Sequence, residues 1–168
     1  MSKLKFAILG CGRISYKHVE ALAANKEEAV LAAVCDLVEE KAEKRKSEYI
    51  EKVGDAEVAV YTDYKKMLKE QDIDVVTIAT ESGYHPEIAM YCMNNKKHVI
   101  CEKPMALSIK NADDMIECSK KNNVKLCVSH QNRFNKPVQQ LRSAVEENRF
   151  GRLVNGTARI LWNRNMGY

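Results

Sequence analysis

Hydrophobic residues follow two alternating patterns along this chain. Short, largely apolar runs are typical of buried parallel strands, and they occupy Leu4–Leu9, Ala29–Cys35, Glu57–Tyr61, Ile73–Ala79, Val99–Cys101 and Val124–Ser129. Segments with helical spacing predict helices over 14–25, Val38–Val53, a short stretch opened by Thr62 or Asp63, His85–Asn94, Ser108 to about Asn122, and from Asn135 with Pro137 in its first turn. Strand and helix therefore alternate through most of the sequence.

This alternation predicts an α/β fold, a Rossmann-type doubly wound parallel sheet with helices on both faces. The pattern changes after Arg152, where Leu153–Trp162 is long, partly alternating and followed by no helix. We interpret it as the first strand of another sheet. The sequence thus predicts one α/β domain over residues 1–130. Residues 131–168 are expected to form a linker helix and the first strand of a truncated α+β C-terminal domain, within which the chain ends.

Composition excludes several classes of protein. The 168 residues are 45% hydrophobic and 30% charged, an ordinary globular balance. A net charge of +4 is too small for the concentrated basic surface of a nucleic-acid binder. No apolar window is long enough for a membrane span, and no signal peptide is evident. We therefore expect a cytoplasmic protein with no membrane or nucleic-acid partner.

The six cysteines form no C-x-x-C pair, and several lie inside apolar runs. In a chain without a secretory signal, such residues are typical of reduced, mostly buried thiols. The same spacing argues against a zinc site. We therefore expect neither disulfides nor a bound metal.

A glycine-rich turn separates the first predicted strand from the first helix. The segment Gly10-Cys11-Gly12-Arg13-Ile14-Ser15 matches G-x-G-x-x-G, with Ser15 at the third glycine position. The first glycine permits a tight turn, the second lets a pyrophosphate approach the backbone, and the third position needs a small residue for packing. Backbone N–H groups at the helix start, including those of Arg13 and Ile14, favour an anion. The turn is a candidate phosphate-binding site.

Asp36 supports this interpretation because of its place in the sequence. It follows the second predicted strand directly, 24 positions after Gly12, close to the spacing of about 20 for a ribose-binding carboxylate. A carboxylate there accepts from ribose hydroxyls and repels a 2′-phosphate, and Leu37 and Val38 offer no arginine for such a phosphate. NAD is therefore favoured over NADP. The alternative is an aspartate that only caps the following helix.

Three further polar loops follow predicted strands: Thr80–Pro86, Glu102–Pro104 and His130–Arg133. The carboxyl ends of the strands in such a sheet share one edge, where ligands bind. Each loop alone is more typical of a solvated surface. Their shared edge, beside the glycine turn, predicts a site.

These segments together resemble the glucose–fructose oxidoreductase/inositol dehydrogenase/rhizopine catabolism (Gfo/Idh/MocA) family. The resemblance is carried by the glycine turn, by Ser82-Gly83-Tyr84-His85, and most specifically by Cys101-Glu102-Lys103-Pro104. It spans nearly the whole chain. The segments His130–Asn135 and Trp162–Arg164 are further similar to the branch that oxidises UDP-N-acetylglucosaminuronic acid at C3.

The resemblance implies roles for the residues after the fifth predicted strand. Lys103 matches the active-site lysine, which contacts the reacting hydroxyl and assists its proton transfer; it would therefore bind both cofactor and substrate. Glu102 matches a residue that positions the nicotinamide ribose. Pro104 matches a proline whose preceding peptide bond is commonly cis.

Two other loops also contain candidate ligand contacts. The loop after the fourth predicted strand resembles a family segment along the nicotinamide half of the cofactor, and its matching residues are Thr80, Ser82 and His85. For His85, a helix N-terminal residue with no ligand role is an equal alternative. Gln131 and Arg133 are candidate contacts to nicotinamide and to a substrate carboxylate, respectively, with an interdomain salt bridge as the alternative.

Members of the family are longer than this chain. They carry a further Asp and His on a C-terminal domain, whose open sheet is used for oligomerisation. The resemblance thus implies a homo-oligomer for the full-length protein and a chain that binds cofactor with little turnover. His18, which matches no family motif, is most simply a packed helix residue.

Two functions remain as hypotheses. The first is an NAD-dependent dehydrogenase that transfers a hydride between nicotinamide and a hydroxyl-bearing carbon of a sugar, nucleotide sugar or cyclitol. The second is a free-standing NAD-binding sensor or regulatory module without catalysis.

Overall fold

The computed structural model describes residues 2–163 and 165. The chain divides into two compact units, Met1–His130 and Gln131–Tyr168. Arg164, which belongs to one of the segments similar to the nucleotide-sugar branch, lies outside the described residues.

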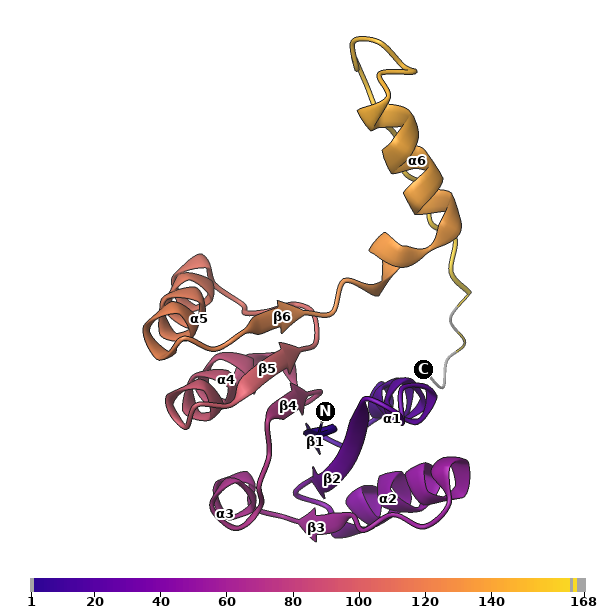
Figure 1. Cartoon of the computed structure of the whole chain (residues 1–168). Coiled ribbons are helices and arrows are strands. Elements are labelled where there is room, and N and C mark those ends of the chain that lie inside the picture. Colours follow the sequence, from indigo (N-terminus) through magenta and orange to yellow (C-terminus); the bar gives the residue numbers. More distant parts are fainter. Residues whose placement is uncertain (1, 164, 166–168) are drawn as a thin grey trace. The chain divides into compact units, whose positions relative to one another are not determined.

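The first unit is a six-stranded sheet with helices between its strands (Figure 1). Its elements in chain order are β1 (Leu4–Leu9), α1 (Ser15–Ala24), β2 (Ala29–Cys35), α2 (Glu39–Val53), β3 (Ala59–Tyr61), α3 (Tyr64–Glu70), β4 (Val75–Ile78), η1 (Ser82–Tyr84), α4 (His85–Asn94), β5 (His98–Cys101), α5 (Ile109–Asn122) and β6 (Leu126–Val128). The strand order is β3-β2-β1-β4-β5-β6, and every neighbouring pair is parallel. This confirms the predicted doubly wound α/β fold.

Helices cover both faces of the sheet. Alternate strand residues point to opposite faces, so Ile8 of β1 packs with α1 and α2, whereas Ala7 and Leu9 pack with α3, α4 and α5. In Figure 1 the first pair of helices and the other three lie on opposite sides of the strands. Burial on both faces explains why the strands are apolar throughout.

Local sequence fixes where the helices begin. Asp63, rather than Thr62, caps α3 by accepting the Lys65 N–H at 2.8 Å. Ser108 caps α5 by accepting the Asn111 N–H at 3.2 Å. Both caps satisfy N–H groups that a helix start leaves without an intrahelical partner. The strands β3, β4 and β6 are shorter than predicted, mostly at their amino ends.

The second unit contains η2 (Gln131–Phe134) and α6 (Lys136–Glu146), with Pro137 in the first turn of α6 as predicted. The strand predicted over Leu153–Trp162 is wrong: residues 153–163 carry no regular structure. Alternating apolar residues favour a strand only when a neighbouring strand takes its backbone hydrogen bonds. The sheet of the described residues does not include this segment, and Val154 and Leu161 are 88% and 80% exposed.

The cysteines are free, and four of them are buried: Cys11, Cys35, Cys92 and Cys101. Cys127 is exposed and Cys118 half-buried. Across the part of the chain that the structure describes, no helix is long and apolar enough to cross a membrane.

Candidate functional site at the carboxyl edge of the sheet

The strand register aligns the loops of the site. Cys35, Leu9, Ile78, Cys101 and Val128 lie opposite one another in one row across β2, β1, β4, β5 and β6. Each is the last residue of its strand, so the polar loops all leave the sheet from the same edge. The strand order also reverses between β1 and β4, and a parallel sheet forms its ligand crevice at that reversal.

Gly10 begins the turn between β1 and α1, and no other residue type fits there. Its φ is +89°, and a Cβ at this position would lie 2.6 Å from the backbone of Ala79 and Thr80. The Gly10 N–H also donates to the carbonyl of Cys35 at 2.9 Å. The first glycine is therefore required because the turn passes tightly across the end of β4.

Gly12 faces open space. Apart from its chain neighbours, no described atom lies within 4 Å of the position where a Cβ would stand. The helix α1 follows, with no acidic residue in its first turn and no side chain capping it. Arg13 and Ile14, between Gly12 and the helix, are exposed. The start of α1 therefore presents backbone N–H groups and the positive end of a helix dipole beside the open space at Gly12.

Asp36 ties the turn to the end of β2. One carboxylate oxygen accepts the Cys11 N–H at 2.7 Å, and the other accepts the Val38 N–H at 2.9 Å. The N-cap position of α2 is Val38, and no side chain caps it. The geometry therefore does not support the alternative that Asp36 only caps this helix. Each of its oxygens retains acceptor capacity for a hydroxyl donor.

A cavity of about 650 Å³ lies beside the turn and Asp36. Its walls come from Gly10 and Gly12, from the end of β2 with Asp36, from Tyr64 of α3, and from the loop after β4. Thr80 on that loop contributes an Oγ1 that is buried without a hydrogen-bond partner, alone among the side-chain atoms of the described residues. An unpaired buried hydroxyl costs free energy unless a ligand completes it.

Glu102 and Lys103 follow β5. Glu102 is 8% exposed, and its Oε1 lies 2.9 Å from Nε2 of His18 on α1. Sequence reasoning misses His18 as part of the site, because the two residues are 84 positions apart. Lys103 is exposed, and its peptide bond to Pro104 is cis, as the resemblance implies. The acid is thus held in place while the lysine side chain is accessible.

His85, the first residue of α4, links two of the loops. It is 1% exposed; its Nδ1 lies 2.9 Å from the carbonyl of Pro104 and its Nε2 lies 3.0 Å from that of Thr80. Both ring nitrogens therefore face backbone carbonyls, and a neutral ring donates to one of the two through its single N–H. This geometry favours the second of the two interpretations of His85, a helix N-terminal residue that touches no ligand. Ser82, half-buried, begins η1 within the loop that His85 secures.

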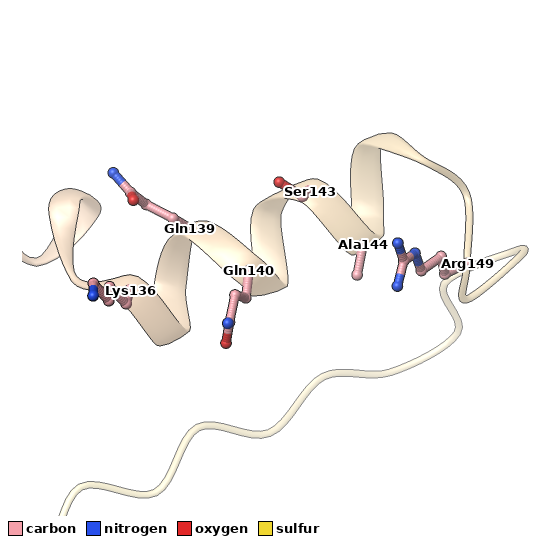
Figure 2. A pocket seen from close by; sticks show the side chains of 6 residues that line it. All are labelled: Lys136, Gln139, Gln140, Ser143, Ala144 and Arg149. Atoms are coloured by element: carbon pink, nitrogen blue, oxygen red, sulfur yellow. The ribbon is translucent and has the colours of Figure 1, made fainter.

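Gln131 and Arg133 are exposed on η2 of the second unit, whereas the cavity and the loops around it belong to the first unit. A cavity of about 440 Å³ also lies in the second unit, along α6 (Figure 2). Figure 2 shows its side chains coming from the helix and the loop after it, among them Lys136, Gln140 and Arg149. The described residues that line this cavity include no carboxylate and no histidine. The cavity is a groove on one exposed helix.

The parallel sheet, the glycine turn and the carboxylate after β2 define a dinucleotide-binding Rossmann domain. Residues 4–130 match the Gfo/Idh/MocA oxidoreductase family with its NAD-binding Rossmann fold. The chain belongs to this family, and the cofactor of its Rossmann domain is NAD.

Relatives of known activity agree with this assignment. The chain is 33% identical over 149 residues to the myo-inositol 2-dehydrogenase of Thermotoga maritima, covering 89% of this chain and 42% of that protein. The crystal structure of the WlbA dehydrogenase from Bordetella pertussis in complex with NADH and UDP-GlcNAcA matches with a TM-score of 0.83 at 32% identity, covering 90% of this chain and 44% of that one. The scyllo-inositol dehydrogenase from Lactobacillus casei, with bound NAD(H) and scyllo-inositol, gives a TM-score of 0.79 at 26% identity, covering 89% and 43%. The chain thus spans less than half the length of these relatives.

The residues present fit NAD. Gly12 leaves the space that a pyrophosphate needs, Asp36 presents acceptors for ribose hydroxyls, and the Thr80 hydroxyl lacks a partner among the described residues. Gly12, Asp36 and Thr80 come from three different loops and line one cavity.

Proposed function

We propose that the protein is an NAD-dependent dehydrogenase that acts on a ring hydroxyl of a sugar, nucleotide sugar or cyclitol. The observation that carries the proposal is the register of the sheet. One row of strand ends leads directly into the glycine turn, Asp36 and the Glu102–Pro104 segment. Cofactor-binding and hydroxyl-binding groups therefore leave the sheet at the same edge.

The glycine turn and Asp36 would bind the adenosine half of the cofactor. The backbone at Gly12, Arg13 and Ile14 would hold the pyrophosphate, because its N–H groups lie at the positive end of α1. The Asp36 carboxylate would accept from the adenosine ribose hydroxyls.

The loops after β4 and β5 would bind the other half. Thr80, Ser82 and Glu102 would line the nicotinamide and its ribose, and the unpaired Thr80 hydroxyl would gain a partner there. Bound NAD supplies the hydride acceptor, which no side chain can provide. The protein contributes binding and orientation.

Lys103 is the residue that we propose for catalysis. Its ammonium group would hydrogen-bond the reacting hydroxyl oxygen and stabilise the negative charge that develops there as the proton leaves. The contact between His85 and the Pro104 carbonyl fixes the backbone on one side of this lysine, while Glu102, held by His18, fixes it on the other.

The substrate class rests on the relatives, whose names state inositols and whose structures hold UDP-GlcNAcA or scyllo-inositol. We propose Arg133 as a contact to a substrate carboxylate and Gln131 as a contact near the nicotinamide. Residues 1–130 would form the NAD-binding domain and residues 131–168 the start of a C-terminal domain, in a homo-oligomeric protein of the cytoplasm. The free thiols suit that reducing compartment.

The experiment is an assay of NAD⁺ reduction by the protein as its gene encodes it, with myo-inositol, scyllo-inositol and UDP-GlcNAcA offered separately. We expect NADH to form with one of these and Lys103→Met to abolish its formation while NADH still binds. Lys121→Met, which removes an exposed lysine on α5, is the matched control and should retain activity. NADH binding without turnover on any hydroxyl substrate would support the sensor hypothesis instead.

A further inference from the structure

Arg45 is a buried arginine on a helix that is otherwise rich in exposed charge. It is 8% exposed, and it shares a buried stripe of α2 with Ala42 and Tyr49. The neighbouring Lys44 is exposed. Because a charged side chain is rarely buried without partners, the contacts of Arg45 indicate what it does.

The hydrogen bonds of the guanidinium group lead to the glycine turn and to one acid. Its Nε donates to Ser15 Oγ at 2.7 Å, its Nη2 donates to the Gly12 carbonyl at 3.2 Å, and its Nη1 donates to the Glu48 carboxylate. Ser15 completes the network, because its hydroxyl donates to the same Gly12 carbonyl at 2.6 Å and its N–H does so at 3.3 Å. Three donors thus converge on one backbone oxygen.

This convergence fixes the orientation of one peptide group. The bond between Gly12 and Arg13 is trans, since the cis bond of the described chain is at Lys103–Pro104. In a trans peptide, the carbonyl and the N–H point in opposite directions. Holding the Gly12 carbonyl toward α2 therefore aims the N–H of this peptide group away from α2.

Arg45 does this without entering the cofactor cavity. Neither Arg45 nor Glu48 lines the cavity beside Gly12 and Asp36, and Glu48 neutralises the guanidinium charge locally. An effect of Arg45 on the cofactor therefore acts through the turn.

We propose that Arg45 is a positioning residue for the pyrophosphate, and that Ser15, in place of the third glycine, connects it to the turn. Glycine at position 15 would leave the Arg45 Nε without its hydroxyl acceptor. Arg45 and Ser15 together hold the phosphate-facing N–H in its binding orientation before a cofactor arrives. The inference rests on the proposed pyrophosphate-binding role of the turn.

The test compares two ligands that differ in the pyrophosphate. ADP-ribose and adenosine are each titrated into the 168-residue chain and its Arg45→Met variant, with amide chemical shifts as the readout. We expect Arg45→Met to weaken ADP-ribose roughly tenfold, equivalent to about 1.4 kcal/mol, and to leave adenosine affinity unchanged. Lys44→Met removes the same charge from the same helix and should bind both ligands as the unmodified chain does.

The other outcomes overturn the inference in distinguishable ways. Equal binding of ADP-ribose by Arg45→Met would show that the turn does not need Arg45, and equal weakening of both ligands would show a general structural role. If the unmodified chain binds no ADP-ribose, the proposed function falls as well.

Two milder variants keep the test decisive if Arg45→Met does not fold. Arg45→Lys keeps the charge but loses the planar fork that reaches Ser15 and Gly12 together, and Ser15→Ala removes only the connecting hydroxyl. Both should weaken ADP-ribose and spare adenosine. If both fold, as judged by circular dichroism, and neither shows this selectivity, the proposal is wrong.

Discussion

Replacing Gly10 by alanine tests the packing that forms the cofactor turn. Two glycines share almost the same φ, +89° at Gly10 and +88° at Gly54. They differ in their surroundings. A Cβ at Gly10 would lie 2.6 Å from the backbone of Ala79 and Thr80, whereas at Gly54 nothing lies within 4 Å among the described residues.

The two substitutions therefore separate backbone strain from steric overlap. A sparsely populated backbone conformation with positive φ costs a non-glycine residue about 1–3 kcal/mol, and both variants incur a cost of this kind. Overpacking against atoms that cannot move adds about 1–3 kcal/mol, and only Gly10→Ala incurs that. We expect Gly10→Ala to lower the free energy of unfolding by this additional amount relative to Gly54→Ala.

Urea unfolding followed by far-ultraviolet circular dichroism measures the difference, provided that the m value stays constant. Gly12→Ala adds a third variant: its Cβ meets no described atom, so stability should be unchanged while NADH affinity falls. Equal destabilisation by Gly10→Ala and Gly54→Ala would refute the steric reason for a glycine at the start of the turn.

Two further predictions concern buried groups. His85→Ala should destabilise the chain by roughly 1–3 kcal/mol, because the carbonyl of Thr80 or Pro104 that accepts from the ring loses its donor; the exposed His130→Ala is its control in the same urea experiment, and equal midpoints would contradict the bridging role. Burial raises the pKa of four thiols from 9.0 to about 12 each: Cys11, Cys35, Cys92 and Cys101. A thiol reagent at neutral pH should therefore modify Cys127 first and spare these four until the chain unfolds. Because the pKa of these thiols is higher in the folded state, their contribution to stability is full below pH 9. This contribution is lost as the pH rises toward 12, by up to about 1.4 kcal/mol per thiol per pH unit. An unfolding midpoint that does not fall across this range would contradict the prediction.

The sequence predicts well the features that depend on neighbouring residues. Gly10, Gly12 and Asp36 lie at a strand end or in a turn beside it, so periodicity and spacing place them correctly. The Asp63 and Ser108 caps are likewise local, because a helix start is satisfied by its own first residues.

Contacts between distant segments escape this kind of analysis. His18 meets Glu102 across 84 positions, and Arg45 meets Ser15 across 30. A signal for Arg45 does exist in the sequence, because it falls on the same helical stripe as Ala42 and Tyr49, both buried. A charged residue on an apolar stripe predicts a buried partner, although the stripe does not say which one.

The error at Leu153–Trp162 has a different origin. Its alternation is compatible with a strand, but a strand exists only through its hydrogen bonds to a neighbour. The described residues offer no such neighbour, so side-chain pattern alone predicts the wrong structure there.

The roles proposed for this protein all depend on NAD binding at the glycine turn and Asp36. Calorimetric titration of the chain and of Asp36→Ala with NADH and, separately, with NADPH is therefore the decisive measurement. We expect the unmodified chain to bind NADH more tightly than NADPH, and Asp36→Ala to lose this preference along with part of its NADH affinity. Tighter binding of NADPH by the unmodified chain, or no binding of either nucleotide, would show that the turn and Asp36 do not form an NAD site.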